Sequence, residues 1–241
     1  MEDITNTTLK TIVTQDFRAA AVFEKYSLDF CCRGGKTIEE ACREGGLDPA
    51  AVLRELKNLD HAGTGPDSRY AEWPLDFLAD YIVNTHHTYV RGAIPVLDAH
   101  TRKIVSVHGA NHPELVAIAE HFQGVASELT SHMMKEERIL FPFIRALALA
   151  DKKPGTFTMP PFGTIRNPIA MMEAEHQDAG DALSAIRSLS AGYEPPPDAC
   201  TTYRVTFQEL KQFERDLHQH VHLENNILFP KAIAIEDRLA G

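Results

Sequence analysis

A short motif that occurs twice limits what this chain can fold into. The segments that begin at His132 and at His220 both read HxxxExxILFP. Around each motif the apolar residues are spaced alternately three and four apart, which is the pattern of the inward face of a bundle helix. We therefore expect His132, Glu136 and Ile139 to lie on the buried stripe of one long helix, and the matching residues on a second.

Each of these two helices is preceded by another apolar stripe that carries one histidine, His87 in the first half and His176 in the second. The pattern predicts two equivalent helical hairpins. Pro142 and Pro230 end the two motifs, and we expect them to kink or close their helices because proline lacks the N–H that a helix needs. The four helices are expected at Pro74–His108, Pro113–Ala150, Asn167 or Pro168 to Ala191, and Asp198–Leu239.

The first part of the chain predicts a smaller helical unit. Thr37 and Glu40 form a capping-box pattern, and glycine pairs at 34–35 and 45–46 separate short helical segments. The segment 61–68, HAGTGPDS, has the composition of a linker. The predicted fold is all-α, with a small helical domain at 1–62 and a four-helix bundle at 74–241. The short helices are expected at Asp16–Tyr26, Thr37–Glu44 and Asp48–Leu59.

Two carboxylates on the buried stripes, Glu136 and Glu224, need compensating positive charge, because a buried unpaired carboxylate is costly. The stripes offer no Lys or Arg near them, whereas two metal ions that both carboxylates bridge would supply it. Bundles with di-iron carboxylate centres hold their metals in this way, with inward ligands from four helices. The predicted ligands are His87, His132, Glu136, His176, His220 and Glu224.

The donor set narrows the metal and its chemistry. Imidazole with carboxylate suits iron, manganese or zinc, and the stripes contain no thiolate that would favour a cysteine-rich zinc site. Two octahedral ions with these six ligands and a solvent-derived oxo or hydroxo bridge would keep about two positions open for a small ligand. A lone buried histidine is more often a hydrogen-bonded core residue, but a matched set on four stripes favours a metal pair.

Other residues near the predicted ligands carry weaker signals. Glu128 and Glu175 lie close to His132 and His176 and are candidates for outer hydrogen-bond partners or proton relays, although a solvated surface position is the more frequent case. We expect His86 to face away from the centre. His218 and His222 are likewise expected on other faces of their helix.

An adjacent cysteine pair, Cys31 and Cys32, lies in the segment LDFCCRGG between two predicted helices. Neighbouring cysteines rarely form a disulfide with each other because the ring is strained. Arg33 could lower the thiol pKa, which would suit a transient redox or metal-transfer role. One buried and one exposed thiol without a role is the alternative, and spacing alone leaves both open. Cys42 and Cys200 are expected to be isolated packing residues.

Composition excludes some function classes. The formal net charge of −10 argues against a nucleic-acid partner, which needs a basic face. We expect no membrane span, since the chain contains no sufficiently long apolar run. The N-terminal residues show no basic segment followed by an apolar one, so we read no signal peptide and expect a cytoplasmic protein.

Five segments together resemble the RIC (repair of iron centres) family of iron–sulfur cluster repair di-iron proteins, including its nitric-oxide-responsive members. They are DFCCRGG, SHMMKEERILFP, MEAEH, PPPDACTT and HLENNILFP. The resemblance implies a hemerythrin-like bundle with two non-haem iron ions on the same six ligands. It also makes Cys31 and Cys32 functional candidates. Oxygen-carrying hemerythrins have a fifth histidine and an aspartate, and their absence from this pattern favours a more open, reactive centre.

The resemblance implies repair or protection of iron–sulfur proteins damaged by nitrosative or oxidative stress, with iron delivery favoured. The partners would be damaged iron–sulfur proteins, with nitric oxide or oxygen as the small ligand. One alternative is binding, scavenging or reduction of nitric oxide to nitrous oxide, so whether the protein is an enzyme stays open. Another is a sensor of nitric oxide or oxygen, or an iron store. A homodimer is also considered.

Overall fold

The computed structural model describes residues 4–59, 70–153 and 160–240, and almost every regular element in them is helical. The only bridge between extended residues in these ranges is an isolated antiparallel one between Thr8 and Thr37. The predicted all-α class is confirmed. The predicted linker at 61–68 lies outside the described residues. None of the described helices is both long and apolar enough to cross a membrane.

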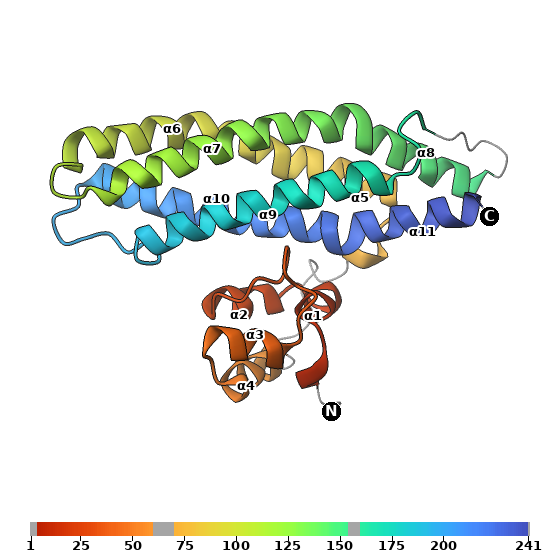
Figure 1. Cartoon of the computed structure of the whole chain (residues 1–241), viewed down its shortest axis with the longest axis horizontal. Coiled ribbons are helices and arrows are strands. Elements are labelled where there is room, and N and C mark those ends of the chain that lie inside the picture. Colours follow the sequence, from red (N-terminus) through yellow and green to blue (C-terminus); the bar gives the residue numbers. More distant parts are fainter. Residues whose placement is uncertain (1–3, 60–69, 154–159, 241) are drawn as a thin grey trace.

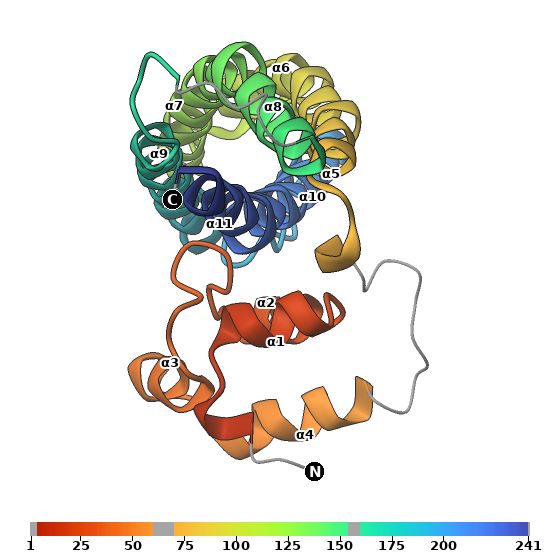
Figure 2. The same ribbon diagram turned by 90° about the vertical axis from the view of Figure 1, so that its right-hand side faces the viewer.

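Four long helical rods lie side by side around a common axis (Figures 1 and 2). The third rod is the single helix α9, Arg166–Leu189. Each of the other three is two α-helices joined by a π-helical turn. The first is α5 (Leu75–Ile82), η5 (Val83–His87) and α6 (Thr88–His108). The second is α7 (Glu114–Lys135), η6 (Glu136–Leu140) and α8 (Phe141–Lys152). The fourth is α10 (Thr201–Leu223), η7 (Glu224–Leu228) and α11 (Phe229–Ala240).

The π-turns correct two expectations about the repeated motif. Pro142 and Pro230 do not close their helices, because each follows a π-turn and falls in the first turn of the next α-helix, where its missing N–H is not needed. In the first motif the wide turn also changes which residues face inward, whereas the matching Ile227 of the second motif is buried as expected. Ile139, expected on the buried stripe, is 52% exposed, and Leu140 and Phe141 take its place in the core.

The N-terminal helices pack beside the bundle, and a loop between α2 and α3 extends from them toward it (Figures 1 and 2). The sequence pattern missed α1, which is rich in β-branched residues that have low helix propensity and which begins after a capping Thr8. The predicted capping box of Thr37 and Glu40 is present. The elements are η1 (Ile4–Asn6), α1 (Leu9–Gln15), α2 (Ala19–Lys25), α3 (Ile38–Gly45), α4 (Pro49–Leu59) and η4 (Tyr70–Glu72).

The apolar core of the bundle forms two clusters, one on each side of the layer that holds the predicted ligands. One cluster includes Phe122 and Phe213 and continues into the N-terminal helices. The other includes Phe141 and Phe229. Polar ligand side chains therefore lie in the middle of the bundle with apolar packing above and below them, which keeps bulk water away.

Candidate metal centre

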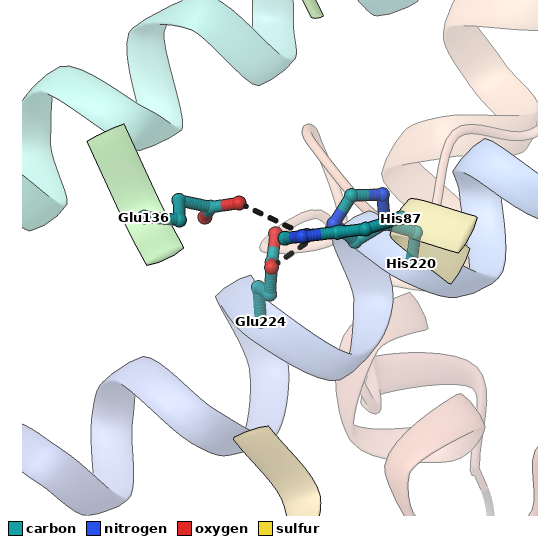
Figure 3. A group of neighbouring side chains, drawn as sticks. All are labelled: His87, Glu136, His220 and Glu224. Carbon is teal, nitrogen blue, oxygen red and sulfur yellow. Dashed lines mark hydrogen bonds and ion pairs between the residues drawn. The ribbon is translucent and has the colours of Figure 1, made fainter. Parts of the chain in front are cut away.

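The six predicted ligands come together in one buried layer of the bundle. They form two groups of four that share Glu136 and Glu224, and within each group the candidate ligand atoms lie within 4.8 Å of one another. All six residues are at most 1% exposed. Figure 3 shows one group, in which two histidines and two carboxylates converge from three rods. The groups are His87, Glu136, His220, Glu224 and His132, Glu136, His176, Glu224.

The distances show each carboxylate between two imidazoles. Glu136 Oε2 lies 3.3 Å from His87 Nε2 and 3.4 Å from His132 Nε2. Glu224 Oε2 lies 3.1 Å from His176 Nε2, and Glu224 Oε1 lies 3.0 Å from His220 Nε2. Every histidine thus presents Nε2 to a carboxylate that the other group also uses, which is the arrangement that two bridged metal ions require.

Buried polar atoms without a hydrogen bond support the fit to a cation. Among the described residues, both carboxylate oxygens of Glu136, Glu224 Oε2 and His87 Nε2 have no partner with hydrogen-bond geometry. Orphaned buried acceptors are rare in native proteins and need an explanation. Oxygen and imidazole-nitrogen donors aimed at a common point form a suitable ligand set for iron.

The π-turns place these residues. His132 and Glu136 span the junction of α7 and η6, His220 and Glu224 span that of α10 and η7, and His87 ends η5. A π-turn widens the helix locally and occurs frequently at functional sites. Here the ligand pair points inward, and the extra residue of the π-turn rotates the positions of the residues that follow it around the helix axis.

The carboxylates change the proton affinity of the histidines. Burial lowers the pKa of His132, but the charges of Glu136 and Glu224 and the hydrogen bonds of Glu136 and Glu175 together outweigh burial and raise that pKa to about 9. Burial opposes ionisation of Glu224 as well, yet His220 and His176 hold its pKa well below the usual range. His132 Nε2 and His176 Nε2 are 3.0 Å apart, within hydrogen-bond distance of each other. Metal binding would replace this contact and release the protons that the ligand nitrogens carry.

The outer nitrogens of three histidines are held by hydrogen bonds. Such partners orient a metal-binding imidazole and fix which nitrogen faces the metal. Glu137 and Glu175 are each also paired with a basic side chain, Arg91 and Lys135 respectively. The bonds run from His87 Nδ1 to Glu137 at 2.6 Å, from His132 Nδ1 to Glu175 at 2.8 Å, and from His176 Nδ1 to Asn225 at 2.9 Å.

These contacts sort the candidates for outer partners. Glu175 is the hydrogen-bond partner of His132 Nδ1, the role for which Glu128 was also a candidate. Glu128 is exposed on α7. Sequence reasoning missed Glu137 and Asn225. One signal could have found them, because each directly follows a ligand glutamate in the repeated motif.

Two other histidines lie outside both ligand groups, as expected, but are buried against neighbouring elements. His86 is only 1% exposed, its Nδ1 lies 3.0 Å from Asp216, and its ring stacks on that of His220 with centroids 5.7 Å apart. His222 is fully buried, and burial lowers its pKa to about 3. Its ring lies 5.4 Å from that of Phe17 because the N-terminal helices cover this side of α10.

The cysteine pair lies in the loop between α2 and α3. Asp29 Oδ1 accepts hydrogen bonds from the backbone N–H of Cys31 at 3.0 Å and of Cys32 at 2.9 Å, and the two sulfur atoms are 3.7 Å apart. These three residues form a third group that could hold a metal ion. A cavity of about 170 Å³ adjoins the pair, between the loop and α9.

The thiol chemistry differs from the expectation. Arg33 pairs with Asp181 at 2.9 Å. The hydrogen bond with Cys32, together with burial, raises the pKa of Cys31 well above its usual range, so this thiol is protonated in the metal-free protein. Cys42 is buried as expected, but Cys200 is exposed at the start of α10 rather than packed.

The fold and this site define a hemerythrin-type cation-binding bundle, a class that implies iron. Residues 78–232 match the hemerythrin HHE cation binding domain. Residues 5–60 match the ScdA_N domain, whose function is described as unknown.

Proteins named iron-sulfur cluster repair protein YtfE align with nearly the whole chain. The relative from Citrobacter koseri is 36% identical, with 91% of this chain and 93% of the relative covered. The relative from Edwardsiella ictaluri is 37% identical, with 90% and 91% covered. The relative from Escherichia coli O81 is 36% identical, with 91% and 93% covered. The chain belongs to this family of iron–sulfur cluster repair proteins.

Proposed function

We propose that this protein holds two non-haem iron ions and repairs iron–sulfur clusters damaged by nitrosative or oxidative stress by delivering iron. The observation that carries the proposal is the pair of four-residue groups that share both buried carboxylates. Bound iron would supply redox chemistry and open coordination positions for a small ligand. His87 and His220 would hold one ion, His132 and His176 the other, with Glu136 and Glu224 between them.

A route for the delivered iron is supported by the position of the cysteine pair. Cys32 Sγ lies 3.5 Å from the backbone carbonyl oxygen of His176, and Cys31 lies directly beside it. Asp29 completes a mixed oxygen and sulfur donor group on this route. The leaving iron ion would pass from the His176 side of the centre to this group and then to an acceptor protein that lacks its cluster iron.

Metal analysis followed by a transfer assay tests the proposal. We expect about two iron ions per chain after anaerobic loading, and transfer of iron to an apo-ferredoxin that slows in Cys31→Ser and Cys32→Ser. Cys200→Ser is the matched control, since Cys200 is exposed at the start of α10 and lies outside the proposed route. A loaded protein with no iron would refute the centre. Transfer that is equally fast in all three variants would refute the cysteine route.

A second candidate function is reduction of nitric oxide to nitrous oxide. It is supported by the ligand count, because six side chains do not fill the coordination shells of two iron ions. Two open positions side by side would bring two nitric oxide molecules into proximity. Nitrous oxide formed over many turnovers would favour this reading, and tight nitric oxide binding without product or iron transfer would instead indicate a sensor.

A further inference from the structure

Two asparagines of η7 hold the cysteine-bearing loop, residues 28–33, against the bundle. Asn225 Nδ2 donates to the backbone carbonyl of Cys31 at 3.4 Å. Asn226 Nδ2 donates to the backbone carbonyl of Phe30 at 3.2 Å. Both side chains come from the π-turn that begins at Glu224. The turn that places a metal ligand therefore also presents two amides to the N-terminal helices.

Only one of the two asparagines also contacts a predicted ligand. Asn225 Oδ1 accepts a hydrogen bond from His176 Nδ1 at 2.9 Å, whereas the further partner of Asn226 is His222 Nδ1, also at 2.9 Å. An amide can accept at its oxygen and donate at its nitrogen at the same time. Asn225 thus forms a continuous bridge from the imidazole of His176 to the backbone of Cys31.

The other half of the bundle has a different residue at the equivalent place. Glu137 directly follows Glu136 as Asn225 follows Glu224, and it accepts from His87 Nδ1 at 2.6 Å. An ionised carboxylate has no hydrogen to donate. Its second partner is Arg91 on the bundle surface, so this half ends in a surface ion pair and makes no corresponding bridge to the loop.

We propose that Asn225 couples docking of the cysteine loop to iron occupancy of the position formed by His132 and His176. The proposal rests on the proposed di-iron function and assigns a regulatory contact to that centre. Iron on His176 Nε2 holds the ring hydrogen on Nδ1, which keeps the Asn225 oxygen as its acceptor and the Asn225 N–H₂ on the carbonyl of Cys31. Iron and the docked loop then stabilise each other by the same factor, because such coupling is reciprocal.

This coupling has a consequence for iron delivery. A loop that leaves the bundle removes Cys31 from Asn225 and loosens the orientation of His176, which weakens the binding of an ion at that position. The loop would undock when an acceptor protein binds to it, so iron would be released where an acceptor is present. Without an acceptor, the docked loop keeps His176 in its binding orientation.

Site-resolved alkylation of the full chain tests the coupling without measuring activity. The metal-free protein is treated with iodoacetamide before and after anaerobic addition of ferrous ion, and mass spectrometry follows each cysteine. Exposed Cys200 is the internal reference for the reagent. We expect iron to slow alkylation of Cys32 in the wild type by roughly 2- to 10-fold, the range that one hydrogen bond of ordinary strength supplies.

Two variants separate coupling from docking. Asn225→Asp keeps the acceptor for His176 but cannot donate to Cys31, so iron should still bind and its effect on Cys32 should disappear. Asn226→Ala also loosens the loop but leaves His176 untouched, so both alkylation rates should rise while their ratio stays as in the wild type. If Asn225→Asp misfolds, Asn225→Leu replaces it in the experiment. This variant lacks both hydrogen bonds, so the effect of iron on Cys32 should disappear in it as well.

The outcomes test the coupling and the di-iron function separately. The same iron effect in Asn225→Asp as in the wild type would overturn the proposal, and so would an equal loss in Asn226→Ala. Direct binding of iron to Cys31 and Cys32 would protect them in every variant, which also overturns it. Metal analysis of the same samples keeps the two proposals apart. Wild-type protein without iron refutes the di-iron function, and iron-loaded protein without protection refutes only the coupling.

Discussion

Raising the pH should destabilise the metal-free protein through the buried ligand cluster. Burial lowers the folded-state pKa of His132, but the nearby carboxylates, Glu136 foremost among them, together raise it from 6.5 to about 9. A group with a raised folded pKa contributes stability that is complete below the unfolded pKa and is lost as the pH rises through the folded one. The loss between pH 6.5 and about 9 is about 3 kcal/mol. The pKa of His87 is raised too, which adds in the same direction.

Urea unfolding monitored by circular dichroism at both ends of this pH range measures the loss of unfolding free energy. Glu136→Gln removes the charge that raises the pKa of His132, so its stability should depend much less on pH. Glu128→Gln makes the same change at an exposed position of the same rod and should lose about 3 kcal/mol, as the wild type does. Iron-loaded protein should not lose stability by this route, because bound metal holds the imidazole neutral. Equal losses in the two variants would refute the reasoning.

Single substitutions separate the roles of neighbouring residues. His87→Ala should lower the metal content while His86→Ala keeps it, and metal analysis of both variants would contradict the ligand choice if the results were reversed. Glu175→Ala should weaken metal binding about 10- to 100-fold in competition with a chelator, whereas Glu128→Ala should leave it unchanged. Phe122→Ala should lower the free energy of unfolding by about 3–5 kcal/mol at constant metal content, since Phe122 is fully buried in the core. An unfolding midpoint equal to that of the wild type would contradict this last expectation.

The fold class and the meeting of the six ligands could be predicted because they depend on periodicity. A stripe with steps of three and four must face one direction on a helix, and a motif repeated in two helices must reach the same depth in both. The structure brings together the residues that this argument selected, His87 and His176 included. Iron binding by these residues stays a prediction.

The π-turns could not be predicted from the same pattern. A π-turn adds a residue to one turn, so it is invisible to a rule that assumes constant periodicity. Up to Glu136 the rule places side chains correctly. After it the rule selects Ile139, which is exposed, in place of Leu140, which is buried, although in the fourth rod it correctly selects the matching Ile227. The prolines that end the two motifs were a local signal of irregularity, but their position in the first turn of a new helix depends on the widened turn before them.

Contacts between the N-terminal helices and the bundle could not be predicted from either part alone. The buried state of His222 follows from what covers it, and the covering residue Phe17 is distant in sequence. Arg33 is adjacent to the cysteine pair, yet it pairs with Asp181 of α9. Sequence proximity was therefore a poor guide to the partner of Arg33.

The places where the two halves differ carry more information about this protein than the places where they agree. The shared residues define two similar ion positions, which any bundle of this class needs. The residue after each ligand glutamate differs, Glu137 in one half and Asn225 in the other, and only the amide reaches the N-terminal helices.

The residue before the ligand histidine of each first helix differs as well. It is Glu175 in one half, which accepts from His132 Nδ1, and His86 in the other, which stacks on His220. Among the described residues His220 Nδ1 has no hydrogen-bond partner. A carboxylate partner raises the basicity of a ligand imidazole, so the four histidines should differ in ligand strength. The internal repeat thus gives a symmetric set of six ligands. Sequence differences next to these ligands make the two ion positions chemically unequal, and the cysteine pair lies beside only one of them.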